Sequence, residues 1–167
     1  MVDSIQPTVD LLKTVRILRD FNDSELTQVL ALGQTQDFEA HSNIVIEGEL
    51  SWGIYLILSG SVGIFKTNKM TGESYDVGQL IKGNFFGEMS LIDREPRSAS
   101  VRALIDSRVF YIDKQSFNQF LGQSPERKIR FYEACLKTVV HRLRETDENY
   151  VVSQYQLWKT ALKKEAA

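Results

Sequence analysis

The chain has 167 residues, 43% of them hydrophobic and 25% charged, and its formal net charge is −2 at pH 7. These values are typical of a soluble globular domain with a sizeable core, and the charge gives no reason to expect nucleic-acid binding. No apolar stretch approaches the roughly 18 residues of a membrane span, and no basic segment followed by an apolar block opens the chain. The single cysteine, Cys135, excludes an internal disulfide and favours a reducing, cytoplasmic compartment.

Two helices are predicted before the first strand, in an N-terminal segment of residues 1–35. Residues 8–19 carry apolar side chains at mostly helical intervals. The second helix has Asn22 or Asp23 as its N-terminal cap and ends at Gly33.

Residues 36–123 are predicted to form a small β-roll or barrel, because many short strands with regular turn signals follow one another up to about residue 112. Within it, residues 54–58 form a continuous apolar run bounded by glycines, as expected of a buried strand. A second turn at residues 70–73 separates two further strands. The predicted fold class is therefore α+β, mainly β.

The most informative segment is 86–101, which reads FGEMSLIDREPRSASV. Gly87 allows a ligand to approach the backbone closely, and the planar fork of Arg97 matches two phosphate oxygens. Glu88, an acceptor when ionised, suits a sugar hydroxyl and would repel a phosphate. Either charged residue alone is most simply an ordinary surface or turn residue, but together in this segment they indicate a sugar phosphate as the ligand.

The last segment, residues 124–167, is predicted to be one long helix. Pro125 follows the capping residue Ser124, and no further proline or glycine occurs, so a helix of about 39 residues would be about 58 Å long. Residues at seven-residue intervals are mostly apolar, and a second set between them becomes polar towards the C-terminus. The two sets are Ile129, Leu136, Leu143, Tyr150 and Leu157, and Tyr132, Val139, Thr146, Ser153 and Thr160. This pattern indicates a coiled-coil seam, and the alternative is a helix that folds back on its own domain or breaks near Asp147.

Segment 86–101 closely resembles the phosphate-binding cassette of cyclic nucleotide-binding domains. The family pattern is Phe-Gly-Glu, a small helix, Pro-Arg, a small residue, Ala, a hydroxyl residue and Val, and every position is filled here. Residues 47–62 are similar to the strand, glycine turn and strand that form the first half of the family's roll. The resemblance covers about 100 of the 167 residues and implies a double-stranded β-helix, or jelly roll, flanked by N-terminal helices and a long C-terminal helix.

The resemblance also implies the roles of the cassette residues. Glu88 would accept the ribose 2′-hydroxyl, and Arg97 would bind the cyclic phosphate. Backbone amides, a side-chain hydroxyl and packing surface would come from Gly87, Met89, Ser90, Ser98 and Ala99. Ser90 departs from the family, which usually has Ala or Gly at this position.

The ligand's base is the least determined part of the implied site. In the family, a residue on the long helix caps the purine, and residues 141–148 resemble the segment that does so, which makes Thr146 the first candidate. The segment lies about one helical turn farther from Pro125 than usual, so Arg142 and Asp147 remain rivals. Cyclic GMP-selective members often have Thr after the arginine, so Ser98 favours cyclic AMP, with cyclic GMP still possible.

The resemblance implies a regulatory module that is a parallel homodimer through its long helix and signals to a separate, unidentified protein. The family's transcription factors continue into a winged helix-turn-helix domain, whereas this chain stops at Ala167 while still helical, so no nucleic-acid partner is expected. A ligand-free dimeric scaffold of the same fold is the alternative. No enzyme, cofactor or metal site is expected, because no nucleophile motif occurs and His41 and His141 lack nearby ligands.

Overall fold

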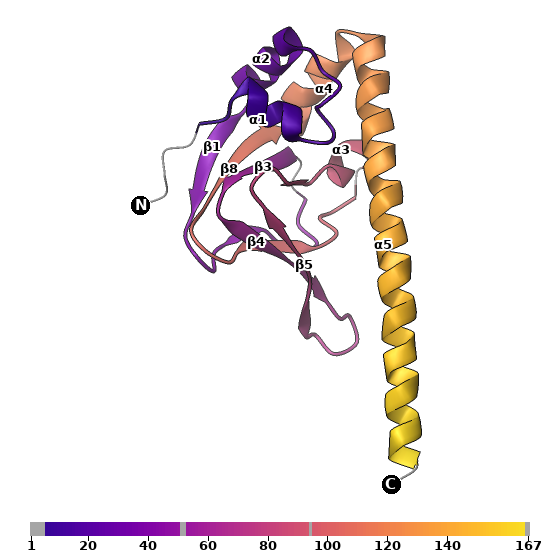
Figure 1. The fold of residues 1–167 in the computed structure, drawn as a ribbon. Coiled ribbons are helices and arrows are strands. Elements are labelled where there is room, and N and C mark those ends of the chain that lie inside the picture. The colour runs from indigo at the N-terminus through magenta and orange to yellow at the C-terminus, as the bar shows by residue number, and fades with distance from the viewer. Residues whose placement is uncertain (1–5, 51–52, 94, 166–167) are drawn as a thin grey trace.

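In the computed structural model, which describes residues 6–50, 53–93 and 95–165, the strands form two four-stranded antiparallel sheets that make up a roll (Figure 1). The strand order is β1-β8-β3-β6 in one sheet and β2-β7-β4-β5 in the other. The strands are β1 (Gln34–Phe38), β2 (Asn43–Val45), β3 (Gly53–Ser59), β4 (Ser61–Thr67), β5 (Ser74–Ile81), β6 (Phe85–Phe86), β7 (Ser100–Ala103) and β8 (Ser107–Asp113). The expected α+β fold, a β-roll with a long C-terminal helix, is confirmed.

Strand β3 explains why residues 54–58 are apolar without interruption, since it is buried on both faces. Ile54, Leu56 and Leu58 join the core beneath the helices, whereas Tyr55 and Ile57 join a second core within the roll. Successive side chains of a strand point to opposite faces, so a strand between two cores must be apolar at every position.

The two predicted N-terminal helices are present, but the first is shorter than expected. Helix α1 (Val9–Thr14) stops at Val15, which adopts an extended conformation, instead of continuing to residue 19. Val15, Ile17 and Leu18 are all buried, and a continuing helix would place residues 15 and 17 on opposite faces. Helix α2 (Asp23–Leu32) has Asn22 as its cap and Gly33 at its end, as predicted.

A helix that the sequence analysis did not predict, α4 (Lys114–Gly122), follows β8 and packs against α2 and α5. The signal was present, because Asp113 caps the helix and Phe117, Phe120 and Leu121 have helical spacing and are buried. A short helix within a segment dominated by strand signals was overlooked.

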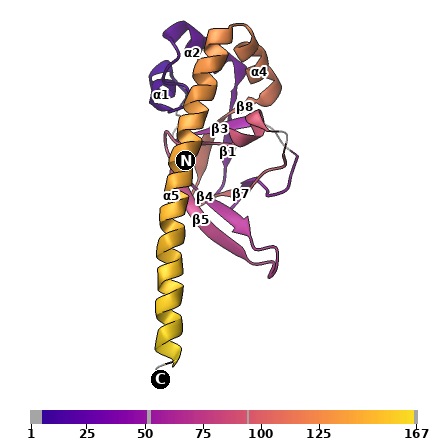
Figure 2. The ribbon, with the colours of Figure 1, turned by 90° about the vertical axis from the view of Figure 1, so that its right-hand side faces the viewer.

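Helix α5 (Pro125–Glu165) is a single helix of 41 residues that runs along the roll and continues beyond it (Figures 1 and 2). Its beginning is fixed to α2, because Glu25 accepts hydrogen bonds from Arg127 Nε at 3.2 Å and from Arg130 Nη2 at 2.6 Å. Buried residues follow at Phe131, Ala134, Cys135 and Thr138. From residue 139 to residue 156, every side chain is exposed except that of Arg142, which is half-buried.

Candidate functional site

The cassette begins where strand β6 ends, at a glycine that no other residue can replace without strain. Gly87 has φ +88°, and a Cβ atom there would lie 2.4 Å from the carbonyl oxygen of Gly53 and 2.7 Å from Arg97 Nη1. Helix α3 (Met89–Ile92) follows directly and contains only four residues. The glycine therefore brings α3 and Arg97 close to the start of strand β3.

Arg97 is buried, with 6% of its surface exposed, and its guanidinium contacts groups of strand β3 and helix α3. Nη1 donates to Gly53 O at 3.3 Å and to Ser90 Oγ at 3.2 Å, and the guanidinium carbon lies 5.5 Å from the centre of the Tyr55 ring. Burial is the main cause of a lowered pKa of Arg97, although an arginine stays protonated in proteins. The site thus keeps a partly desolvated cation, which attracts an anion strongly.

The backbone of Arg97 is fixed as firmly as its side chain. Gly48 N donates to Arg97 O at 2.9 Å, and Arg97 N donates to Glu49 O at 3.0 Å. Residues 48 and 49 are part of the segment 47–62 that resembles the family's first strands, and here they have a direct structural purpose: they hold the phosphate-binding candidate in place.

Glu88 is even more deeply buried, with 1% of its surface exposed, and Arg142 of helix α5 neutralises it. Arg142 Nη1 donates to Glu88 Oε1, and Nη2 donates to Phe85 O at 3.4 Å. A buried carboxylate needs such a partner, because an isolated charge away from water is costly. The predicted ribose acceptor is therefore linked to the long helix.

Arg97 and Glu88 face the same cavity of about 330 Å³, which is at the small end of the usual range for ligand sites. Eight of the nine predicted site residues line it: Gly87, Glu88, Met89, Ser90, Arg97, Ser98, Ala99 and Arg142. The cavity also has apolar walls that the sequence analysis did not assign, including Val45, Ile64, Phe86 and Val101. Strand alternation could have indicated these residues once the roll was proposed.

The structure does not bring Thr146 to this cavity. Its side chain is exposed one helical turn beyond Arg142, and its hydroxyl donates to Arg142 O at 2.8 Å. Asp147 is exposed as well. Of the three base-capping candidates, only Arg142 lines the cavity.

The fold and the cassette agree with comparisons to known proteins. Residues 35–124 match the family model of the cyclic nucleotide-binding domain. This chain belongs to that family. It is 34% identical over 113 residues to the cAMP-dependent protein kinase regulatory subunit of Candida albicans, an alignment that covers 68% of this chain and 24% of the relative. The chain thus spans about a quarter of that protein's length.

Two solved structures show the same fold. The regulatory domain of Toxoplasma gondii PKA, crystallised with cAMP, is 28% identical, with a TM-score of 0.66 over 76% of this chain and 48% of that chain. The catabolite activator protein of Thermus thermophilus is 26% identical, with a TM-score of 0.70 over 82% of this chain and 62% of that chain. The predicted family is therefore confirmed.

Within residues 6–50, 53–93 and 95–165, no group of three or more His, Cys, Asp or Glu side chains could hold a metal ion. Over the same ranges, no helix combines the length and the apolar character needed to cross a bilayer.

The reactivity of the Cys135 thiol measures whether α5 is packed against the rest of the domain. It is fully buried, and desolvation is the main cause that raises its pKa from 9.0 to about 12. A folded-state pKa above the unfolded value contributes stability that is complete below about pH 9 and is lost as the pH rises towards 12. At about pH 8.5, where the stabilisation is complete, we expect iodoacetamide to modify urea-unfolded protein rapidly and native protein very slowly. Rapid modification of native protein would show that α5 does not bury Cys135 as the structure has it.

Proposed function

We propose that this chain is a non-catalytic, cytoplasmic regulatory module that binds a 3′,5′-cyclic purine nucleotide in the cassette cavity. One observation carries the proposal: a buried cation, Arg97, and a buried carboxylate, Glu88, face one cavity of about 330 Å³. A guanidinium suits the cyclic phosphate, and a carboxylate accepts the ribose hydroxyl. The cAMP in the crystal of the Toxoplasma relative supports this ligand class.

Cyclic AMP is the preferred nucleotide in this proposal. Ser98 follows Arg97 on the cavity wall, where cyclic GMP-selective family members often have Thr. Arg142 is the proposed base-side residue of α5, because it lines the cavity and Thr146 does not.

A thermal shift measurement with a panel of nucleotides tests the ligand class. A ligand at 100 times its dissociation constant stabilises the native state by about 2.7 kcal/mol, which raises the unfolding midpoint by about 5–11 °C for a chain of this size. We expect cyclic AMP to give the largest shift, cyclic GMP a smaller one and 5′-AMP none. Tighter binding of cyclic GMP would overturn the preference, and no shift with any cyclic nucleotide would leave the dimeric scaffold as the better function.

The proposed assembly is a parallel homodimer through α5. The heptad side chains point away from the roll, with Ile129, Leu136, Leu143 and Tyr150 exposed by 58–64%. An apolar groove of about 520 Å³ between α3 and α5 continues this seam. Lys128 and Glu133 flank the seam. In a parallel pair, Lys128 lies opposite Glu133 of the second copy, whereas an antiparallel pair brings like charges together at these two positions. The charges therefore favour the parallel arrangement. The side chains of the last heptad positions, Leu157 and Thr160, lie outside the described part.

Sedimentation of the wild type and a Leu136→Asp, Leu143→Asp variant tests the dimer. We expect the wild type to sediment as a dimer at tens of micromolar and the variant as a monomer, because two buried charges would disrupt the seam. A Lys137→Asp, Arg144→Asp variant is the control, because its changes lie outside the two sets of residues that form the seam. A monomeric wild type would exclude the seam.

In the proposed mechanism, the ligand signals through α5 to a separate protein. Glu88 can accept from Arg142 and from a ribose hydroxyl together, since a carboxylate has about four acceptor positions. Cyclic nucleotide binding then favours the conformation in which α5 is docked. Unchanged hydrogen exchange along residues 125–163 at saturation would exclude α5 as the signalling element.

A further inference from the structure

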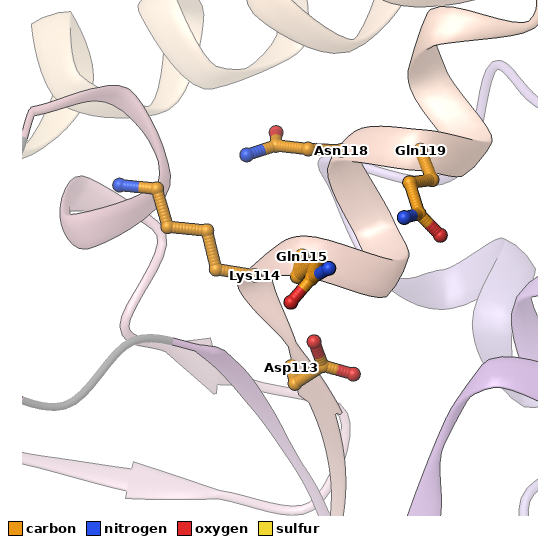
Figure 3. Close-up of a pocket in the computed structure, with 5 residues that line it drawn as sticks. All are labelled: Asp113, Lys114, Gln115, Asn118 and Gln119. Atoms are coloured by element: carbon orange, nitrogen blue, oxygen red, sulfur yellow. The ribbon is translucent and has the colours of Figure 1, made fainter.

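We propose that Lys114 is a positioning residue of the nucleotide site, because its ammonium group holds the C-terminal end of the cassette helix α3. Lys114 does not line the cavity. It is the first residue of α4, and its side chain extends from there towards the turn that carries α3, while Gln119 points to the other side of α4 (Figure 3). The inference rests on the proposed function of the cavity.

The contacts of Lys114 are those of a helix cap supplied from elsewhere in the chain. Nζ donates to the carbonyl oxygen of Ser90 and, at 2.9 Å, to that of Asp93. Carbonyls in the last turn of a helix have no partner within the helix, and a cation near them is favourable. Lys114 therefore provides both the hydrogen bonds and the charge that this end of α3 needs.

Helix α3 depends on such support because it has little else to hold it. It contains four residues, and two of them, Met89 and Ile92, are 46% and 53% exposed. Helices this short are unstable alone, and only Ser90 and Leu91 are buried. The side chain of its N-cap residue, Glu88, makes no capping hydrogen bond.

Ser90 connects this cap to the phosphate-binding candidate. Its carbonyl accepts from Lys114, and its hydroxyl accepts from Arg97 Nη1 at 3.2 Å and donates to Gly87 O at 2.8 Å. The residue that departs from the usual Ala or Gly is thus the one that joins Lys114 to Arg97. Losing the cap would allow Ser90, and with it Arg97, to shift.

The strands make this connection rigid. Asp113, which caps α4 by accepting from Ser116 N at 2.9 Å, is paired with Gly53 across strands β8 and β3. Gly53 O accepts from Arg97, and Lys114 directly follows Asp113. The adjacent ends of β3 and β8, at Gly53 and Asp113, therefore hold both Arg97 and, through Lys114, helix α3.

The test compares Lys114→Met, which keeps the length of the stem, with Lys114→Arg, which keeps the cation. Lys82→Met, at an exposed turn, is the matched control. In ligand-free protein, we expect faster hydrogen exchange at residues 89–93 in Lys114→Met, and near wild-type exchange in the other two variants. We also expect affinity for cyclic AMP to fall about tenfold in Lys114→Met and to recover in Lys114→Arg.

A double-mutant cycle with Ser90→Ala separates positioning from general weakening. If Lys114 acts through Ser90, the double variant loses less affinity than the product of the two single losses. Independent effects that multiply would overturn the proposal, as would a Lys114→Met variant that matches Lys82→Met in exchange and affinity. A wild type that binds no cyclic nucleotide would refute the proposed function, while the exchange measurement would still decide whether Lys114 holds α3.

Discussion

Replacing Arg97 by alanine is expected to weaken cyclic AMP binding by about 30-fold to several thousand-fold. The guanidinium is buried and hydrogen-bonded to Gly53 and Ser90, and the Arg97 backbone is hydrogen-bonded to residues 48 and 49, so the side chain meets the phosphate with little reorganisation. Removing one partner of a desolvated charge pair costs about 2–5 kcal/mol, which corresponds to that range of affinity. Isothermal titration of both proteins measures the loss directly.

Arg102→Ala is the matched control for this experiment. Arg102 lies five positions farther along, on strand β7, where it contacts Asn43 and the Phe65 ring and does not line the cavity. It should bind cyclic AMP like the wild type. If Arg97→Ala kept the wild-type affinity, the phosphate would have to be bound elsewhere.

The second large effect is expected on folding stability, from Arg142→Gln. The change leaves Glu88, whose side chain is 2% exposed, as a buried carboxylate without its cation. Breaking a buried pair costs about 3–5 kcal/mol, and because the Arg142 side chain is 41% exposed, solvent screening places the expected loss at about 2–3 kcal/mol. Urea denaturation of ligand-free protein measures this loss.

Arg144→Gln provides the control, since it removes the same charge from an exposed position of the same helix and should change stability by about 0.5 kcal/mol or less. The Glu88→Gln, Arg142→Gln double variant should recover much of the loss, because it contains no buried charge. Equal stability of the Arg142→Gln and Arg144→Gln variants would show that the ion pair does not support α5.

Local patterns predicted most of the fold, and contacts between distant residues account for what they missed. The apolar run at residues 54–58, the Asn22 cap and the Pro125 start each depend on neighbours in the chain, and each appears where expected. Helix α1 ends early because tertiary burial of Val15 and Ile17 overrides helical spacing.

The candidate site likewise combines residues that local sequence predicted with residues that depend on distant contacts. The cassette motif placed the residues around Glu88 and Arg97 on one cavity, because a continuous segment carries its own geometry. The residue that α5 contributes depends on how a long helix lies against the roll, and residue spacing alone could not decide between Arg142 and Thr146. Lys114 was missed because its role comes from a contact across 21 residues of chain.

The position of Arg142 along α5 gives the helix the proportions of a lever. Among the α5 side chains that the structure describes, Thr138 is the last buried one, and Arg142 one turn later bonds to Glu88, yet the helix continues to Glu165. The 23 residues from 143 to 165 extend for about 35 Å at about 1.5 Å per residue. A tilt of about 10° around this fulcrum would therefore move the far end by about 6 Å over that length. In the proposed mechanism, a ligand that tilts α5 by this angle at Arg142 would displace a protein bound near Glu165 by more than an atomic diameter.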